Sequence, residues 1–330
     1  MTHIQVTNGH NGLANLGNTC YLNTALQCIM HQVDFVHFLL ERKYKQQDNP
    51  HTLRIIDELS NLAQTYWSST SSLVNPQRFV HIARNMFKQH MEVLMQNDME
   101  EFLILLLTKM CEEIGETWEK PKIMLTGKDP KRHLVASMEN SWTDSHKKEY
   151  SKLIDLVYGQ TITQVKCDAC SYMTHAHEVF TTIPISMPTT NAITLEELID
   201  ENKQRESLQC WKCDKCAATS DAKRSAKFWR FPQVLIIVLK RFASGFTKNN
   251  APVTIPEHLD LDKHSIYETC KFDLVSLGCH KGDMHGGHYY AICKHPDGSY
   301  YLYDDDHVQK VDNPTSRPHQ DFYVAVYEKS

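Results

Sequence analysis

The sequence predicts an α+β protein in which a helical first half precedes a strand-rich second half. Between Cys20 and about Gly115, apolar residues recur at intervals of three and four, as they do on one face of an amphipathic helix. From about Leu153 onward, short runs rich in β-branched and aromatic residues alternate with turn formers, which is typical of strands. Because helices and strands are segregated along the chain, we expect an α+β architecture rather than a doubly wound parallel sheet.

The composition is that of a globular protein long enough to bury a core. The chain has 330 residues, of which 41% are hydrophobic and 23% are charged. No apolar run approaches the roughly 18 residues that a membrane-spanning helix needs, so we expect no membrane partner. The net charge of −5 argues against nucleic acid as a partner. Eleven cysteines behind a polar N-terminus favour a reducing compartment, the cytoplasm or the nucleus, in which thiols serve as metal ligands or nucleophiles.

The helical half is expected to hold four helical segments. Apolar residues from Leu22 to Leu40 predict one buried helical face, and similar spacing predicts helices over 53–67 and 76–87. A fourth helix should begin at Asp98, which is placed as an N-cap with Glu101 three residues later, a capping-box arrangement. The charged, breaker-rich residues 120–148 are expected to form a surface loop.

The second half is expected to contain strands and one short helix. The helix is predicted over 195–203, and a turn at Pro296, Asp297 and Gly298 predicts a hairpin within 285–306. The strand-like runs lie at 159–167, 178–187, 234–242, 272–280, 288–295, 299–306 and 322–329.

One cysteine lies where a loop gives way to a helix. Gly17 and Asn18 are turn formers, and Asn18 or Thr19 can cap the following helix. Cys20 would then sit in the first helical turn, where free backbone N–H groups and the positive end of the helix dipole favour a thiolate. A lone cysteine is more often an ordinary buried residue, but the glycines and asparagines before Cys20 favour a shaped loop.

The segment 12–31 resembles the cysteine box of the ubiquitin-specific proteases, whose pattern is GLxNLGNTCYxNxxLQ. The resemblance implies a papain-like cysteine protease fold, with a helical thumb over about 11–150 and a β-rich palm and zinc-bearing β fingers over about 151–328. The fingers would occupy about 160–230, and the whole would be a single catalytic domain over 11–328. The matching residues are Gly12, Leu13, Asn15, Leu16, Gly17, Asn18, Thr19, Cys20, Tyr21, Asn23, Leu26 and Gln27.

A thiolate nucleophile needs a base, usually a histidine, and the histidine needs an orienting group. The chain has nineteen histidines, so context must select one. The predicted hairpin brings His288 near the acidic run that begins at Asp304, although the register cannot be read from the sequence. Gly286 and Gly287 allow close approach of another segment to His288. The alternative is a surface histidine beside a solvated acidic run.

The hairpin resembles the histidine box of the same family, GGHYxAY followed by a YxFDD-like strand. That resemblance implies that His288 is the general base, that Asp304 orients it, and that Asp305 supports or substitutes for Asp304. Cys293 departs from the pattern near a position that is often aromatic, and we expect it to be structural.

The resemblance also implies residues that bind the substrate and the oxyanion. Asn15 matches the family asparagine whose amide stabilises the oxyanion together with the Cys20 N–H, although it could simply be a turn residue. Gln96 and Asp98 belong to a stretch that resembles the family motif QQDxxEF, whose Asp binds the basic C-terminal tail of ubiquitin; Asp98 could cap its helix as well. Phe242 and Tyr289 match positions that line the channel for the end of the tail, although each could be a core aromatic.

Two pairs of cysteines have the spacing of zinc ligands, Cys167-x-x-Cys170 and Cys213-x-x-Cys216. The 42 residues of 171–212 separate the pairs, which exceeds a compact zinc ribbon but suits two strand tips that meet. The family has zinc-bearing fingers with a similar gap, which implies one structural Zn²⁺ held by four thiolates. The alternatives are four unconnected thiols, or a site in which another nearby side chain substitutes: Cys210, His175 or His177.

The resemblance implies a monomeric thiol protease that hydrolyses the bond after the C-terminal glycine of ubiquitin, with ubiquitin and ubiquitinated proteins as partners. No cofactor would take part in the chemistry. Two alternatives remain open: a ubiquitin-binding pseudoenzyme, and a protease for a ubiquitin-like modifier.

Overall fold

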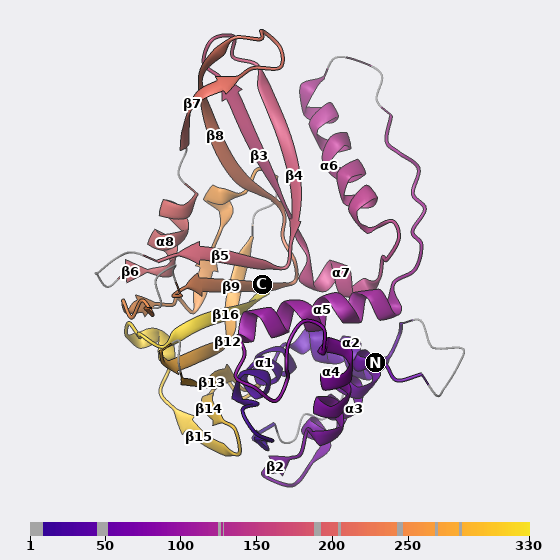
Figure 1. Ribbon diagram of the computed structural model, residues 1–330, viewed down its shortest axis with the longest axis vertical. Helices are drawn as coiled ribbons and strands as arrows, with labels where there is room; N and C mark the ends of the chain where they lie inside the picture. The colour runs from indigo at the N-terminus through magenta and orange to yellow at the C-terminus, as the bar shows by residue number, and fades with distance from the viewer. Residues whose placement is uncertain are drawn as a thin grey trace.

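The computed structural model describes residues 9–44, 52–124, 127, 129–187, 193–203, 206–242, 247–267, 270–283 and 286–330. The helices within residues 20–114 form one body, and a large sheet packs beside it (Figure 1). A second, narrower sheet extends away from both (Figure 1). Helices and strands are therefore segregated along the chain, and the predicted α+β class is confirmed.

The described helices follow the chain in two groups. Those of the first half are α1 (Cys20–Met30), α2 (Val33–Glu41), α3 (Ile55–Ser68), α4 (Gln77–Phe87), α5 (Met99–Ile114), α6 (Pro130–His146) and α7 (Lys152–Val157). Those among the strands are α8 (Leu195–Asn202) and the short 3₁₀ turns η1 (Asp262–His264) and η2 (Pro314–Ser316). Within the described parts of the chain, no helix is long and apolar enough to cross a bilayer.

The large sheet has eight strands in the order β15-β14-β13-β12-β16-β9-β5, with β11 paired to β12. Its strands are β5 (Thr182–Ser186), β9 (Val234–Lys240), β11 (His258–Asp260), β12 (Lys271–Gly282), β13 (Gly287–Lys294), β14 (Tyr300–Asp304), β15 (His307–Val311) and β16 (Phe322–Lys329). The narrow sheet, β4-β3-β8-β7, consists of β3 (Gly159–Cys167), β4 (Met173–Phe180), β7 (Glu206–Lys212) and β8 (Thr219–Arg230). Two small parallel pairs complete the set: β1 (Gly12–Leu13) with β2 (Leu73–Val74), and β6 (Ile193–Thr194) with β10 (Val253–Thr254).

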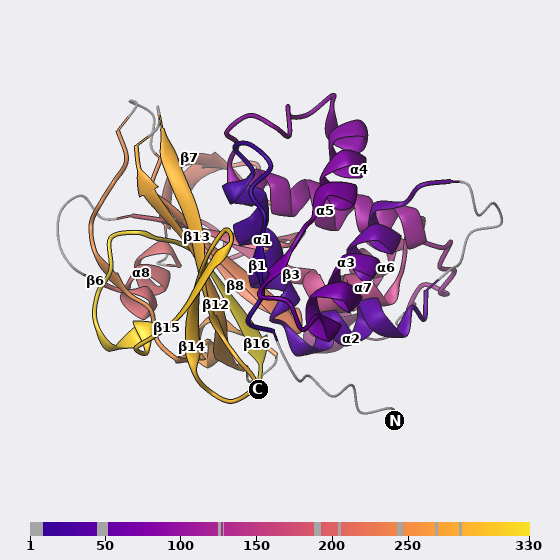
Figure 2. The same cartoon turned by 90° about the horizontal axis from the view of Figure 1, so that it is seen from below.

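The large sheet separates two hydrophobic cores. Side chains alternate across a strand, so in β9 Val234 and Ile236 face the helical core, whereas Leu235 and Ile237 face a second core on the other side. Figure 2 shows α1 lying between the sheet and the remaining helices. The sequence of β9 is apolar from Val234 to Leu239, in keeping with the burial of both faces of the strand, and only Lys240 at its end is exposed.

The single helical face predicted from Leu22 to Leu40 is wrong in two respects. The chain breaks at His31 and Gln32 into α1 and α2, and Val33 is 49% exposed. Every residue of α1 is buried, because the helix is enclosed between the sheet and the other helices. Its polar side chains find partners there: the Gln27 amide donates to the Asn11 carbonyl and accepts from the Tyr66 hydroxyl.

The surface loop predicted over 120–148 is also wrong, because residues 130–146 form α6. Asp129 accepts a hydrogen bond from the Lys131 N–H and caps the helix, and Pro130 occupies the first turn, where its missing N–H costs nothing. Met138 and Trp142, four residues apart, are both buried on one face of the helix. The charged residues of α6 mark its exposed face rather than a loop.

Candidate active site

The loop before α1 is fixed by Asn15 and Thr19. The Asn15 side-chain oxygen accepts from the Gly17 N–H at 2.9 Å, and the Thr19 hydroxyl accepts from the Leu16 N–H at 2.9 Å. Thr19 occupies the N-cap position, but no side chain caps the helix there, so the predicted capping by Asn18 or Thr19 is wrong. The Thr19 hydroxyl serves the loop instead, and Cys20 is the first residue of α1 as expected.

Cys20 and His288 meet across the boundary between the helices and the large sheet. The Cys20 thiol lies against the His288 ring, and this contact raises the pKa of His288. The other side of the ring is held by Asp304, whose Oδ1 is hydrogen-bonded to Nε2, so Nδ1 is the ring nitrogen left for the thiol. The predicted hairpin, with its turn at 296–298, carries both His288 and Asp304. The structure therefore brings together the nucleophile, base and orienting acid that the sequence predicted.

Asp305 makes different contacts from Asp304. Its Oδ2 accepts a 2.8 Å hydrogen bond from the Asn15 amide, and its Oδ1 accepts one of 2.8 Å from the Asn23 amide. The distance from Asp305 Oδ2 to His288 Nε2 is 3.9 Å. Asp305 thus fixes the direction of the Asn15 amide, while Asp304 is the carboxylate that holds the imidazole.

The pKa of His288 is raised from its usual 6.5 to about 9. The contact with Cys20 is the largest cause; burial opposes it, and the hydrogen bond and charge of Asp304 reinforce it. The imidazolium form is therefore stabilised in the folded protein. That stabilisation is complete below about pH 6.5, and it is lost as the pH rises through about 9.

The raised pKa of His288 predicts a titration midpoint that substitutions of its neighbours should lower. In wild type, the His288 ring should titrate near pH 9, followed by NMR of ¹³C-labelled histidine. Cys20→Ala should lower the midpoint most and Asp304→Asn should lower it less, because an amide still accepts a hydrogen bond but carries no charge. A wild-type midpoint near 6.5 would contradict the Cys20–His288–Asp304 arrangement.

A cavity of about 290 Å³ opens beside Cys20. Its walls come from α1, from the segment before α5, from β13 and from the chain after β9. All four predicted substrate-binding residues line it: Gln96, Asp98, Phe242 and Tyr289. Two further lining residues, His280 and Asp283, were not anticipated from the sequence.

Asp98 caps α5, as predicted. It also makes a second set of contacts, which the sequence did not predict. Its Oδ1 accepts from the Glu100 N–H at 2.7 Å, and its Oδ2 accepts from the Tyr323 hydroxyl at 2.7 Å. Tyr323 lies on β16, at the far end of the sequence. No motif in the sequence marks Tyr323, because its contact with Asp98 exists only once β16 has paired with β12.

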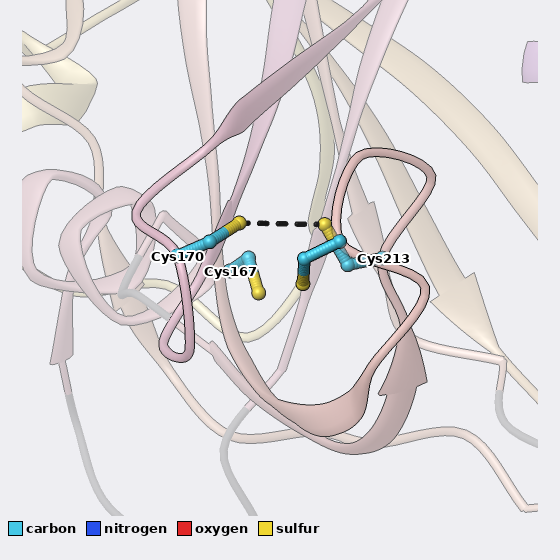
Figure 3. Close-up of side chains that lie close together, drawn as sticks. Cys167, Cys170 and Cys213 are labelled. Atoms are coloured by element: carbon cyan, nitrogen blue, oxygen red, sulfur yellow. Dashed lines mark hydrogen bonds between the residues drawn. The ribbon is translucent and has the colours of Figure 1, made fainter.

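The four predicted metal ligands also converge. Cys167 is the last residue of β3 and Cys170 lies in the β3–β4 connection, whereas Cys213 and Cys216 lie in the β7–β8 connection. Their sulfur atoms all lie within 4.8 Å of one another, and Cys170 Sγ is 3.7 Å from Cys213 Sγ (Figure 3). Among the described residues, this group does not include the alternative ligands Cys210, His175 and His177. Four thiols so placed could hold a metal ion.

Comparison with known proteins gives consistent matches over almost the whole chain. A family model described as ubiquitin carboxyl-terminal hydrolase matches residues 11–327. Human Ubiquitin carboxyl-terminal hydrolase 21 is 28% identical over 92% of this chain and 59% of its own length. Ubiquitin carboxyl-terminal hydrolase 5 of Saccharomyces cerevisiae is 24% identical over 96% of this chain and 44% of its own length. The chain therefore spans about three fifths or less of these curated relatives.

Solved structures show the same fold at lower sequence identity. A SAGA DUB module of Ubp8, Sgf11, Sus1 and Sgf73 bound to monoubiquitin matches with a TM-score of 0.76 at 18% identity, over 98% of this chain and 69% of that one. The same module bound to ubiquitin aldehyde matches with a TM-score of 0.74, also at 18% identity, over 99% and 70%. The predicted fold, that of a ubiquitin-specific protease catalytic domain, is thereby confirmed. With the family model matching from residue 11 to residue 327, the chain belongs to the ubiquitin carboxyl-terminal hydrolase family.

Proposed function

We propose that the chain is a deubiquitinating thiol protease that hydrolyses the peptide or isopeptide bond after the C-terminal glycine of ubiquitin. The observation that carries the proposal is the arrangement in which Cys20 lies against His288 and His288 is hydrogen-bonded to Asp304, beside a cavity that the substrate tail can enter. Names of the relatives and the ubiquitin bound in similar solved structures support the same substrate.

The reaction is an acyl transfer in two steps. The Cys20 thiolate attacks the glycine carbonyl carbon, and the His288 imidazolium donates its proton to the leaving amine as the C–N bond breaks. A thioester then links ubiquitin to Cys20. Water attacks the thioester while His288 accepts one of its protons, and the C–S bond breaks. Ubiquitin leaves as a carboxylic acid that loses its proton to solvent, and the Cys20 thiolate and the His288 imidazolium are restored.

The negative oxygen of each tetrahedral intermediate needs hydrogen-bond donors. The amide of Asn15 has two N–H bonds; one donates to Asp305, and the second remains for the oxyanion. The Cys20 backbone N–H is the second donor, because it lies in the first turn of α1, where backbone N–H groups have no partner within the helix. Asp305 therefore contributes by orienting Asn15 rather than by binding the substrate.

Asp98 provides a prediction that separates binding from chemistry. Asp98→Ser should raise KM for ubiquitin substrates by roughly tenfold or more, because a partly desolvated carboxylate is lost from the cavity. The rate of iodoacetamide alkylation of Cys20 should not change. Serine is a good N-cap, so α5 should stay intact, whereas Asp98→Ala should also lose about 1 kcal/mol of folding stability. If Asp98→Ser slowed ubiquitin hydrolysis and iodoacetamide alkylation of Cys20 by the same factor, Asp98 would only cap its helix.

The four cysteines fit a structural zinc ion. In a tetrahedral site with zinc–sulfur distances of about 2.3 Å, the sulfur atoms lie about 3.8 Å apart, close to the 3.7 Å between Cys170 and Cys213. Zinc bound there would crosslink the β3–β4 and β7–β8 connections, and four thiolates would leave it no open position for catalysis. Bound zinc and eleven cysteines that form no disulfide are compatible with the reducing cytoplasm or nucleus, which we propose as the location.

Hydrolysis of ubiquitin that carries a fluorogenic amine on its C-terminal glycine tests the proposal. Wild type should release the amine with a kcat in the usual enzymatic range of about 1–10³ s⁻¹. Tight ubiquitin binding without release would instead indicate a pseudoenzyme. Preference for a ubiquitin-like modifier bearing the same amine would indicate a different substrate.

A further inference from the structure

The carboxylate of Asp98 is held by two separate parts of the chain. Its Oδ1 accepts hydrogen bonds from Glu100 N at 2.7 Å and Glu101 N at 3.2 Å, at the start of α5. Its Oδ2 accepts from the Tyr323 hydroxyl at 2.7 Å and from the more distant Tyr289 hydroxyl at 3.5 Å. One oxygen therefore belongs to the helix cap, and the other belongs to the cavity side.

Tyr323 stands behind the cavity wall. It is 4% exposed and is not among the described residues that line the cavity. Its ring lies edge-on to Phe242 at 5.7 Å and is 6.2 Å from the ring of Tyr289, and both of these residues do line the cavity. Any influence of Tyr323 on a substrate must therefore pass through Asp98 or through these two rings.

The phenol of Tyr323 is a permanent hydrogen-bond donor. Burial, and then the neighbouring charge of Asp98, raise its pKa far above the usual value of 10. It therefore keeps its proton at every working pH. A short bond from a neutral donor to a carboxylate is among the stronger hydrogen bonds in proteins, and it restrains rotation of the acceptor.

We propose that Tyr323 is a positioning residue, whose phenol keeps Oδ2 of Asp98 fixed at the cavity, where the basic tail of the substrate can take the place of the long Tyr289 contact. The proposal rests on the proposed function, because that tail is the one of ubiquitin. Without the phenol, only the α5 cap would restrain the Asp98 carboxylate. The carboxylate would then have to be ordered when the substrate binds, which would weaken substrate binding. A purely structural alternative is that the bond only ties α5 to β16.

Steady-state kinetics on fluorogenic ubiquitin distinguish the two. Tyr323→Phe should raise KM about tenfold with kcat within about twofold of wild type, the loss expected for one hydrogen bond to a charged group. In the Asp98→Ser background, Tyr323→Phe should change KM by less than about twofold, because its target is gone. Alkylation of Cys20 by iodoacetamide should be unaffected.

Tyr327→Phe is a matched control. Tyr327 lies on the same strand, is fully buried, and donates its hydroxyl to the Pro256 carbonyl at 2.9 Å. This variant loses a comparable bond away from the cavity, so it should lower the melting temperature to a similar extent and keep the wild-type KM. A rise in KM for Tyr327→Phe equal to that for Tyr323→Phe would support the structural alternative.

Ubiquitin binding to the same variants in a Cys20→Ala background separates this inference from the proposed function. Calorimetry should show the same pattern in Kd. A wild type that binds but does not hydrolyse ubiquitin would refute the proposed activity, and the Kd pattern would then decide the role of Tyr323. An unchanged Kd and KM in Tyr323→Phe, or an effect that multiplies in full with Asp98→Ser, would overturn the inference.

Discussion

Cys20→Ala is expected to lower hydrolysis of ubiquitin substrates by at least about three orders of magnitude. Cys20 is the thiol that lies against His288 at the cavity, and no other cysteine lines that cavity in the described part of the chain. The substitution removes one sulfur atom from a side chain that is 6% exposed, so the surface that binds ubiquitin is left in place. Calorimetry should therefore give a Kd for ubiquitin within about threefold of wild type.

Cys210→Ser is the matched control for this experiment. Cys210 is exposed and lies outside the four-cysteine group, so its loss should change neither hydrolysis nor ubiquitin binding. Residual turnover by Cys20→Ala above a few parts per thousand would place the nucleophile elsewhere, since nucleophile loss typically costs several orders of magnitude.

Removal of zinc is expected to unfold the narrow sheet, β4-β3-β8-β7. Among the described residues, the apolar cluster between this sheet and α6 contains three buried side chains, Met138, Ile162 and Trp229, so burial alone contributes little to its stability. Structural zinc can supply about 10–16 kcal/mol of apparent binding energy in small domains. Chelation, or Cys213→Ser, should therefore make proteolysis within β3–β8 at least about tenfold faster, because cleavage follows the population of the open form.

Metal analysis provides the direct check. Wild type and Cys210→Ser should each contain one zinc per chain, and Cys213→Ser should contain much less. Iodoacetamide should still alkylate Cys20 in the chelated protein, because the cysteine group belongs to the narrow sheet, whereas Cys20 begins α1 and His288 lies on the large sheet. Folded, active protein without zinc would refute the structural role of the ion.

The sequence was most informative where local chemistry determines local structure. The capping role of Asp98, the turn at 296–298 and the position of Cys20 at the start of a helix each depend on a few adjacent residues, and all three were predicted correctly. The resemblance to a known family then selected His288 among nineteen histidines, which spacing alone could not have done.

Contacts that depend on register or strand order could not be predicted. A one-residue shift of the hairpin would exchange the environments of Asp304 and Asp305, so only the structure shows that Asp305 binds the Asn15 amide. The bond from Tyr323 to Asp98 needs β16 to lie beside β12 in the assembled sheet. Neither relation leaves a periodic or local signal in the sequence.

The helix α6 was missed for a different reason. Charged residues and a proline suggested a loop, but Pro130 stands at the first helical position, where proline is favoured, and Asp129 before it is the cap. The signal was therefore present in the dipeptide Asp129-Pro130. The many charged residues around this dipeptide obscure the signal, because they are equally typical of a surface loop.

Reaction of the protein with ubiquitin that carries an electrophile in place of its C-terminal carboxylate tests the central claim most directly. Mass spectrometry of the product should show a single ubiquitin adduct, and peptide mapping should place it on Cys20. Cys20→Ala should form no adduct, and ubiquitin-like modifiers with the same electrophile should react at least about tenfold more slowly, as a substrate site specific for ubiquitin requires. An adduct on another cysteine, no adduct with wild type, or a faster reaction with another modifier would contradict the assignment of Cys20 as the nucleophile of a ubiquitin-directed protease.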